Sequence, residues 1–157
     1  MKIWQRYLIV LITFLVAAGG SYWYYQYNRE HSSLSDVFQV RTTVSGFGDE
    51  LRQVSLLAPA ADVAKAMDSH YSYYVHPDLL AKWKADPIHA PGRLTSSPWP
   101  DFIEITSATK NPDGSYTVDG MIAERTSSDV HPSNFIRVRF IVTKGPDGWQ
   151  ITDYQKL

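Results

Sequence analysis

The clearest structural signal in this 157-residue chain is the stretch IRVRFIV at residues 136–142. Apolar residues alternate here with arginines, which is the period of a β-strand that buries one face. We therefore predict a strand whose core-facing side chains are Ile136, Val138, Phe140 and Val142.

Similar strand patterns flank this stretch on both sides. Residues 102–108 and 116–123 alternate in the same way, and Trp149, Ile151 and Asp153 share one face of a last strand. The tetrads NPDG at 111–114 and GPDG at 145–148 are typical of tight turns. The sequence thus predicts an antiparallel meander of about four strands.

Helical spacing precedes the strands. Apolar residues three and four apart predict a helix from Pro59 to Tyr74, and a second helix is expected over Pro77–Ala85. Residues 49–57 fit a helix or a strand. The proline-rich stretch 88–101 predicts an ordered loop in which Trp99 is mostly buried. Helices followed by a meander indicate an α+β domain over residues 49–157.

The amino-terminal region carries a membrane signal. Lys2 and Arg6 are the only charged residues before Arg29, and a helix over residues 7–28 would be about 33 Å long. Aromatic residues crowd both ends of this segment, as at membrane interfaces. We predict a cytoplasmic tip over 1–6, a single-pass anchor in the lipid bilayer over 7–28 and a stalk over 29–48, with the domain outside the cytoplasm. The alternative is a signal peptide cleaved near residues 18–20, which would make the protein secreted.

Composition excludes several classes of protein. The chain has no cysteine, which excludes a disulfide scaffold and cysteine-ligated metal sites. A net charge of −1 with mixed signs gives no reason to expect a nucleic-acid partner. No phosphate-binding loop or dinucleotide motif occurs, and we expect no cofactor.

The order of elements resembles the nuclear transport factor two-like superfamily. The resemblance rests on the helix pair, the strands after Phe102 and the ending DGWQITD at 147–153. It implies a curved antiparallel sheet wrapped round helices as a cone. The stretches LLAKW at 79–83 and APGRLTSSPWP at 90–100 are also similar to small uncharacterised membrane-anchored or secreted proteins of Gram-positive bacteria. The superfamily contains isomerases, dehydratases, transport factors and assembly modules, so it leaves the activity open.

Catalytic members of that superfamily use acids, histidines or tyrosines inside the cone. The corresponding candidates in this chain are His70, Tyr71, Tyr74, Asp101, Glu104 and Asp153. The acids have no sequence neighbour that demands a raised pKa, so we interpret them as exposed or paired and predict no catalytic residue.

Two groups are candidates for binding. Tyr71, Tyr74, Trp83 and Trp99 would line a ligand pocket in the cone, or else fill the core. Arg137 and Arg139 would contact an anion, or else pair across strands with Asp119 or Glu124.

Metal binding is not expected. His70, His76 and Asp78 do not have the spacing of zinc ligands on a helix. His76 and Asp78 fit a helix start, where an acid is favoured by the helix dipole.

These observations predict a membrane-anchored extracytoplasmic binding or interaction module without catalysis, which binds a partner protein or a small ligand at the cell surface. Two alternatives remain open. One is an isomerase- or hydrolase-like enzyme that uses the cone pocket, and the other is a structural subunit of an envelope or secretion complex.

The anchor prediction is checked by mass spectrometry of the native protein. An uncleaved segment 7–28 should leave a membrane-bound chain that contains the amino-terminal residues. A mature chain that begins near Ser21 would contradict the anchor and favour a secreted protein.

Overall fold

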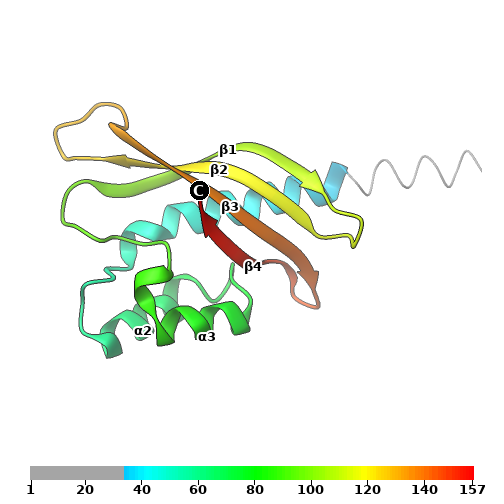
Figure 1. Ribbon diagram of the computed structural model, residues 1–157, viewed down its shortest axis with the longest axis horizontal. Helices are drawn as coiled ribbons and strands as arrows, with labels where there is room; N and C mark the ends of the chain where they lie inside the picture. The colour runs from blue at the N-terminus through cyan, green and yellow to red at the C-terminus, as the bar shows by residue number, and fades with distance from the viewer. Residues whose placement is uncertain (1–33) are drawn as a thin grey trace, which may run out of the picture. The chain divides into compact units, whose positions relative to one another are not determined.

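Four antiparallel strands in sequence order form one sheet: β1 (Trp99–Lys110), β2 (Tyr116–Arg125), β3 (Asn134–Gly145) and β4 (Gly148–Lys156) (Figure 1). The structure is a computed structural model that describes residues 34–157. Both predicted tight turns join their strands, and each contains a glycine with positive φ, +88° at Gly114 and +120° at Gly148. The predicted α+β class and four-stranded meander are confirmed.

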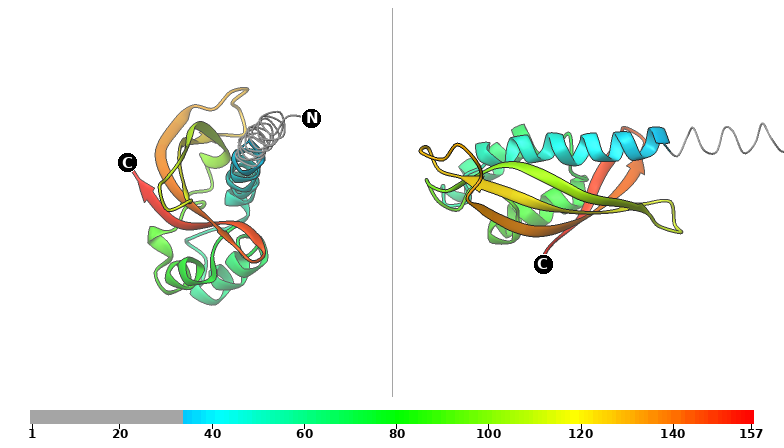
Figure 2. Two further views of the ribbon diagram at one scale, coloured as in Figure 1. Left: turned by 90° about the vertical axis from the view of Figure 1, so that its right-hand side faces the viewer. Right: turned by 90° about the horizontal axis from the view of Figure 1, so that it is seen from above.

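The two faces of the sheet differ as the alternation predicts. Val138, Phe140 and Val142 are completely buried, and Ile136 is half-buried near the end of β3. Across β2 the same face presents Val118 opposite Phe140. Figure 2 shows that the sheet is strongly twisted, so this face is concave toward the helices.

The first described helix covers residues 34–50 and continues into a short 3-10 turn, η1 (Leu51–Gln53). Val40, Val44, Phe47 and Leu51 are all 0% exposed, and their spacing of three and four places them on one helix face. The predicted boundary between a stalk over 29–48 and a domain starting at 49 is therefore wrong. Residues 38–157 form one compact unit, because the buried face of this helix belongs to the core.

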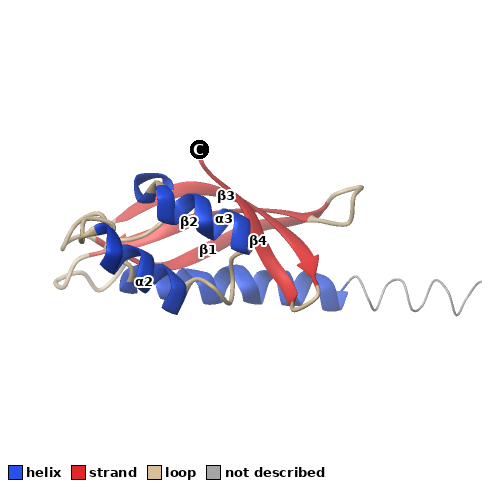
Figure 3. Cartoon of the chain, turned by 90° about the horizontal axis from the view of Figure 1, so that it is seen from below, coloured by secondary structure: helices blue, strands red, loops and turns tan. Residues whose placement is uncertain are grey.

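Two further helices cover the concave face, α2 (Ala60–His70) and α3 (Pro77–Ala85) (Figure 3). Proline at the first position of α3 suits a helix start, and the His76 ring accepts a hydrogen bond from the Asp78 N–H at 3.3 Å. The helix over Pro77–Ala85 has the predicted bounds. The preceding helix ends at His70 rather than at Tyr74, because the chain must turn toward β4.

Backbone hydrogen bonds attach the irregular segments to the helices and sheet. The α2–α3 connection pairs with β4 through His76 N–H to Ile151 O (2.9 Å) and Ile151 N–H to Tyr74 O (2.8 Å). The loop after the short 3-10 turn η2 (Pro87–His89) is tied to the segment after η1, where Arg93 N–H donates to Val54 O at 2.9 Å. This loop is therefore held against the rest of the domain.

Aromatic packing joins these elements around Phe47. The centroid of its ring lies 4.9 Å from that of Tyr71, 6.0 Å from that of Trp83 and 6.1 Å from that of Phe140. Phe47 thus connects the first helix, the turn after α2, α3 and β3.

The predicted cytoplasmic tip and membrane anchor, residues 1–28, lie outside the described residues. Within residues 34–157, no helix combines the length and apolar character needed to cross a bilayer.

Replacing Phe47 by alanine should lower the free energy of unfolding by about 3–5 kcal/mol, because a large buried ring leaves a cavity. Phe38→Ala is the matched control, since this phenylalanine lies on the same helix and is 72% exposed. Its effect should stay within about 0.5 kcal/mol. Urea denaturation measures both changes, and equal losses would contradict the assignment of Phe47 to the core.

Candidate functional site

Tyr71 and Trp83, two of the residues predicted to line a pocket, are core side chains. Tyr71 is 0% exposed and Trp83 is 4% exposed, and their ring centroids lie 6.2 Å apart. Tyr74 is half-buried, with its ring centroid 6.4 Å from that of Phe47. The structure therefore brings these three rings together and supports the core interpretation for Tyr71 and Trp83.

The hydroxyl of Tyr71 has a structural role. It donates a 2.8 Å hydrogen bond to the carbonyl of Pro91, in the loop after η2. Burial raises the pKa of Tyr71 well above its ordinary value, so this hydroxyl stays protonated and keeps the loop in place.

Trp99 lies apart from the Phe47 cluster, at the start of β1. Its side chain is partly buried, which agrees with the expectation that it is mostly buried, and the guanidinium of Arg52 lies 5.1 Å from the centroid of its ring. This cation–π contact attaches the first residue of the sheet to η1.

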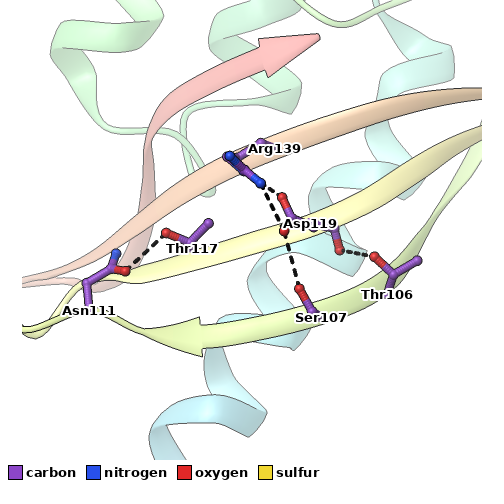
Figure 4. A network of polar contacts seen from close by, with 6 residues as sticks. All are labelled: Thr106, Ser107, Asn111, Thr117, Asp119 and Arg139. Carbon is purple, nitrogen blue, oxygen red and sulfur yellow. Dashed lines mark hydrogen bonds and ion pairs between the residues drawn. The ribbon is translucent and has the colours of Figure 1, made fainter. Parts of the chain in front are cut away.

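Arg139 pairs with Asp119 across β2 and β3 (Figure 4). Its Nε donates to Asp119 Oδ1 at 2.6 Å and its Nη2 donates to Oδ2 at 3.2 Å, while the Ser107 hydroxyl also donates to Oδ2 at 3.4 Å. The hydrogen bond from Arg139 is the main cause that lowers the pKa of Asp119. Cross-strand pairing, one of the two interpretations of the arginines, therefore holds for Arg139. Arg137 is exposed opposite Met121.

The candidate acids on β1 point away from the core. Asp101 forms an ion pair with Arg125 at 3.2 Å. Glu104 is exposed. Neither acid lies beside Tyr71 or Tyr74 in a common recess, which a general base in that position would require.

A β-bulge determines the side to which Asp153 points. Ile151 and Asp153 lie opposite neighbouring residues of β3, so Thr152 is an additional residue in β4. Asp153 is exposed as a result, and Tyr154 takes the inner position, with its ring centroid 5.5 Å from that of Phe140. The prediction that Asp153 shares a face with Ile151 is wrong, because strict alternation does not include the bulge.

The histidine candidates are separated in the fold. His70 Nδ1 lies 2.6 Å from a carboxylate oxygen of Glu50, and His76 caps α3. In the described part of the chain, no three His, Asp or Glu side chains come together in a group able to hold a metal ion.

A recess of about 390 Å³ lies at the end of the concave face where β3 extends beyond β4. Ile122 and Ile136 line it from the sheet, and Ile88 and Leu94 line it from the loop that follows α3. Its lining is mainly apolar, as in sites that hold the body of a small ligand.

Glu124 brings a carboxylate to this recess. It continues the inner-face series of Val118 and Ile122, and one of its oxygens accepts a 2.6 Å hydrogen bond from the amide of Asn134. Sequence reasoning considered Glu124 only as a partner for an arginine. Its even-numbered position after Ile122 is the signal that would have placed it on the inner face.

Tyr154 and Lys156 line the recess from β4. Burial raises the pKa of Tyr154 to about 12, so its hydroxyl is a hydrogen-bond donor at neutral pH. Lys156 is exposed at the end of the strand. The recess therefore combines an apolar floor with the carboxylate of Glu124, the hydroxyl of Tyr154 and the peripheral ammonium of Lys156, and the polar side chains of His89 and Gln155 also line it.

Comparison of this chain with protein families, characterised proteins and solved structures finds no match.

The pairing of Asp119 with Arg139 predicts a pH-dependent part of the stability. Because the pKa of Asp119 is lowered in the folded chain, the contribution is present above the unfolded value of about 3.9 and is lost as pH falls through the folded pKa. Asp119→Asn should therefore lower the melting temperature near neutral pH more than at pH 2. Arg139→Gln should remove most of the same pH dependence, and the double variant should add little. An Asp119→Asn effect that is the same at both pH values would contradict the pairing.

Proposed function

We propose that this chain is a membrane-anchored binding module whose extracytoplasmic domain holds a small ligand in the recess between β3, β4 and the loop after α3. The ligand class is a molecule with an apolar body and a hydrogen-bond-donating or cationic group. The body contacts the isoleucines and Leu94, and the polar group contacts Glu124.

The observation that carries the proposal is the position of Glu124 beside an apolar floor. A carboxylate that already accepts one hydrogen bond from Asn134 retains acceptor positions for a ligand. A charge-assisted hydrogen bond there would orient a ligand that apolar contact alone would bind in several orientations.

Binding without catalysis is supported by how the other candidate groups are used. Asp101 and Asp119 are engaged by arginines, and the Tyr71 hydroxyl by a backbone carbonyl. Asp153 points outward on the bulge. The ion pairs and the hydrogen bond of these groups stabilise the fold. General acid–base chemistry needs a positioned group that is not already engaged in such an interaction.

The location outside the cytoplasm is supported by the sequence. Lys2 and Arg6 precede an uncharged segment over residues 7–28, and positive residues favour the cytoplasmic side of a membrane. The resemblance to nuclear transport factor two-like proteins, if it extends to function, implies a pocket inside the cone as the place for a ligand.

An enzyme of the isomerase or hydrolase type is the second candidate, favoured by one observation. Glu124 and the protonated Tyr154 line the same recess, and proton transfer uses an acid and a hydrogen-bond donor that face the same ligand. This candidate would be favoured if the protein converts a bound ligand and if Glu124→Gln abolishes that conversion while the ligand still binds.

Binding is tested with two fluorinated probes of equal size, 4-fluorobenzylamine and 4-fluorobenzoate. The full chain in lipid nanodiscs is titrated and followed by ¹⁹F NMR. The amine should bind more tightly than the carboxylate. Glu124→Gln should lower the affinity for the amine by about 10-fold, because a charge-assisted hydrogen bond is lost. Glu104→Gln is the matched control, since this glutamate is exposed outside the recess.

A second variant distinguishes binding in the recess from binding elsewhere on the surface. Ile88 is 60% exposed at the recess, so Ile88→Trp should fill the space without disturbing the core. Both probes should then lose binding. Equal affinity in Glu124→Gln and Glu104→Gln, or unchanged binding in Ile88→Trp, would contradict the proposed site.

A further inference from the structure

A second cavity, of about 320 Å³, lies beside the β3–β4 turn, at the other end of β3 from the recess. Three segments line it: the first helix through Phe38 and Thr42, the α2–α3 connection through Tyr73, and the β3–β4 hairpin through Asp147 and Trp149. We refer to it as the aromatic cavity.

Two aromatic rings at the aromatic cavity are left in water. Phe38 is 72% exposed and Tyr73 is 80% exposed. Tyr73 packs only edge-on against Tyr74, with ring centroids 5.1 Å apart. Both rings are mostly exposed, so they contribute little buried surface to the fold.

A cationic group lies beside one of the residues that line this cavity. Trp149 is 6% exposed, and the ammonium of Lys144 lies 5.5 Å from the centroid of its ring. Exposed aromatic rings and lysines are both typical of the membrane–water interface, where rings enter the headgroup layer and lysine ammonium groups remain hydrated.

The order of the chain brings this end of the domain within reach of the predicted anchor. Phe38 follows Asn28, the last residue of the predicted anchor, by only ten positions. Ten residues span at most about 33–36 Å when fully extended, whatever their conformation. The aromatic cavity therefore has a tether short enough to let it meet the bilayer surface.

We propose that the aromatic cavity is a lipid-contact surface, in which Phe38 and Tyr73 enter the interfacial layer of the bilayer and lipid headgroups occupy the cavity. This inference rests on the proposed membrane anchoring. Among the other strongly exposed apolar side chains, Leu34 lies on the same helix as Phe38, whereas Leu57, Ile88 and Val130 lie on other segments. Val130 is in the β2–β3 loop, at the opposite end of β3 from the aromatic cavity.

Docking through this surface would orient the ligand recess. The twelve residues of β3 span about 36 Å between the β3–β4 turn and Asn134, near the recess. In Figure 1 the β2–β3 loop and the β3–β4 turn lie at opposite ends of the sheet. The recess would thus open away from the bilayer, toward ligands in solution.

The test uses spin labels, because the chain has no native cysteine. Single cysteines are introduced at Phe38, Tyr73 or Val130, and the full chain is reconstituted in phosphatidylcholine vesicles. Collision with oxygen, which concentrates in lipid, is compared with collision with a water-soluble nickel chelate. The ratio of oxygen to nickel accessibility should be several-fold higher at positions 38 and 73 than at position 130.

A second measurement guards against an effect of the label on docking. A spin label on a cysteine that replaces Asp147 should show a lipid-like ratio of oxygen to nickel accessibility in the otherwise native chain. In the Phe38→Asp/Tyr73→Asp variant the same label should show a water-like ratio. The Leu57→Asp/Val130→Asp variant is the matched control and should leave the label at 147 in lipid.

The outcomes separate this inference from the proposed function. Water-like accessibility at 38, 73 and 147 in a chain that floats with vesicles and resists alkaline extraction would overturn the docking and leave the anchor intact. Exclusion of both reagents at 38 and 73 would indicate a protein contact and would also overturn it. A chain that alkaline carbonate extracts from the vesicles would overturn the anchor, and the docking with it.

Discussion

The burial of Phe47 is the interaction on which the rest of the domain depends. Its ring contacts aromatic side chains from the turn after α2, from α3 and from β3. Phe47 itself is 0% exposed on a helix that precedes all of these segments in the sequence. Each contact joins elements that are distant in the chain, so this one side chain helps to fix the places of the helices on the sheet.

Hydrogen bonds between polar groups attach the segments that lie at the edge of the apolar core. The Tyr71 hydroxyl ties the loop after η2 to the core, and the backbone of Ile151 ties the α2–α3 connection to β4. On the outer face, Asp119 and Arg139 join β2 to β3. Two of these groups, the Tyr71 hydroxyl and the Arg139 guanidinium, belong to residues that the sequence offers as catalytic or anion-binding candidates.

The two proposed sites lie at opposite ends of β3, and these ends differ in chemistry. One end borders a recess with an apolar floor, Glu124 and Tyr154. The other end turns beside a cavity with the exposed rings of Phe38 and Tyr73. A strand is an extended spacer of nearly fixed length, so β3 would keep the proposed ligand site and the proposed membrane contact apart.

The sequence by itself determined the sheet, the turns and α3. Period-two alternation in IRVRFIV and the turn tetrads depend on neighbouring residues alone, as does the proline that begins α3. Three features could not be read locally. The first helix was interpreted as part of a stalk, because Val40, Val44 and Phe47 are embedded among polar residues and become a core face only when the sheet covers them. The bulge at Thr152 turned Asp153 outward and Tyr154 inward, since register is set by pairing with β3 and not by alternation within β4. The recess at Glu124 exists only where β3 extends beyond β4, which is a property of strand lengths in the folded sheet.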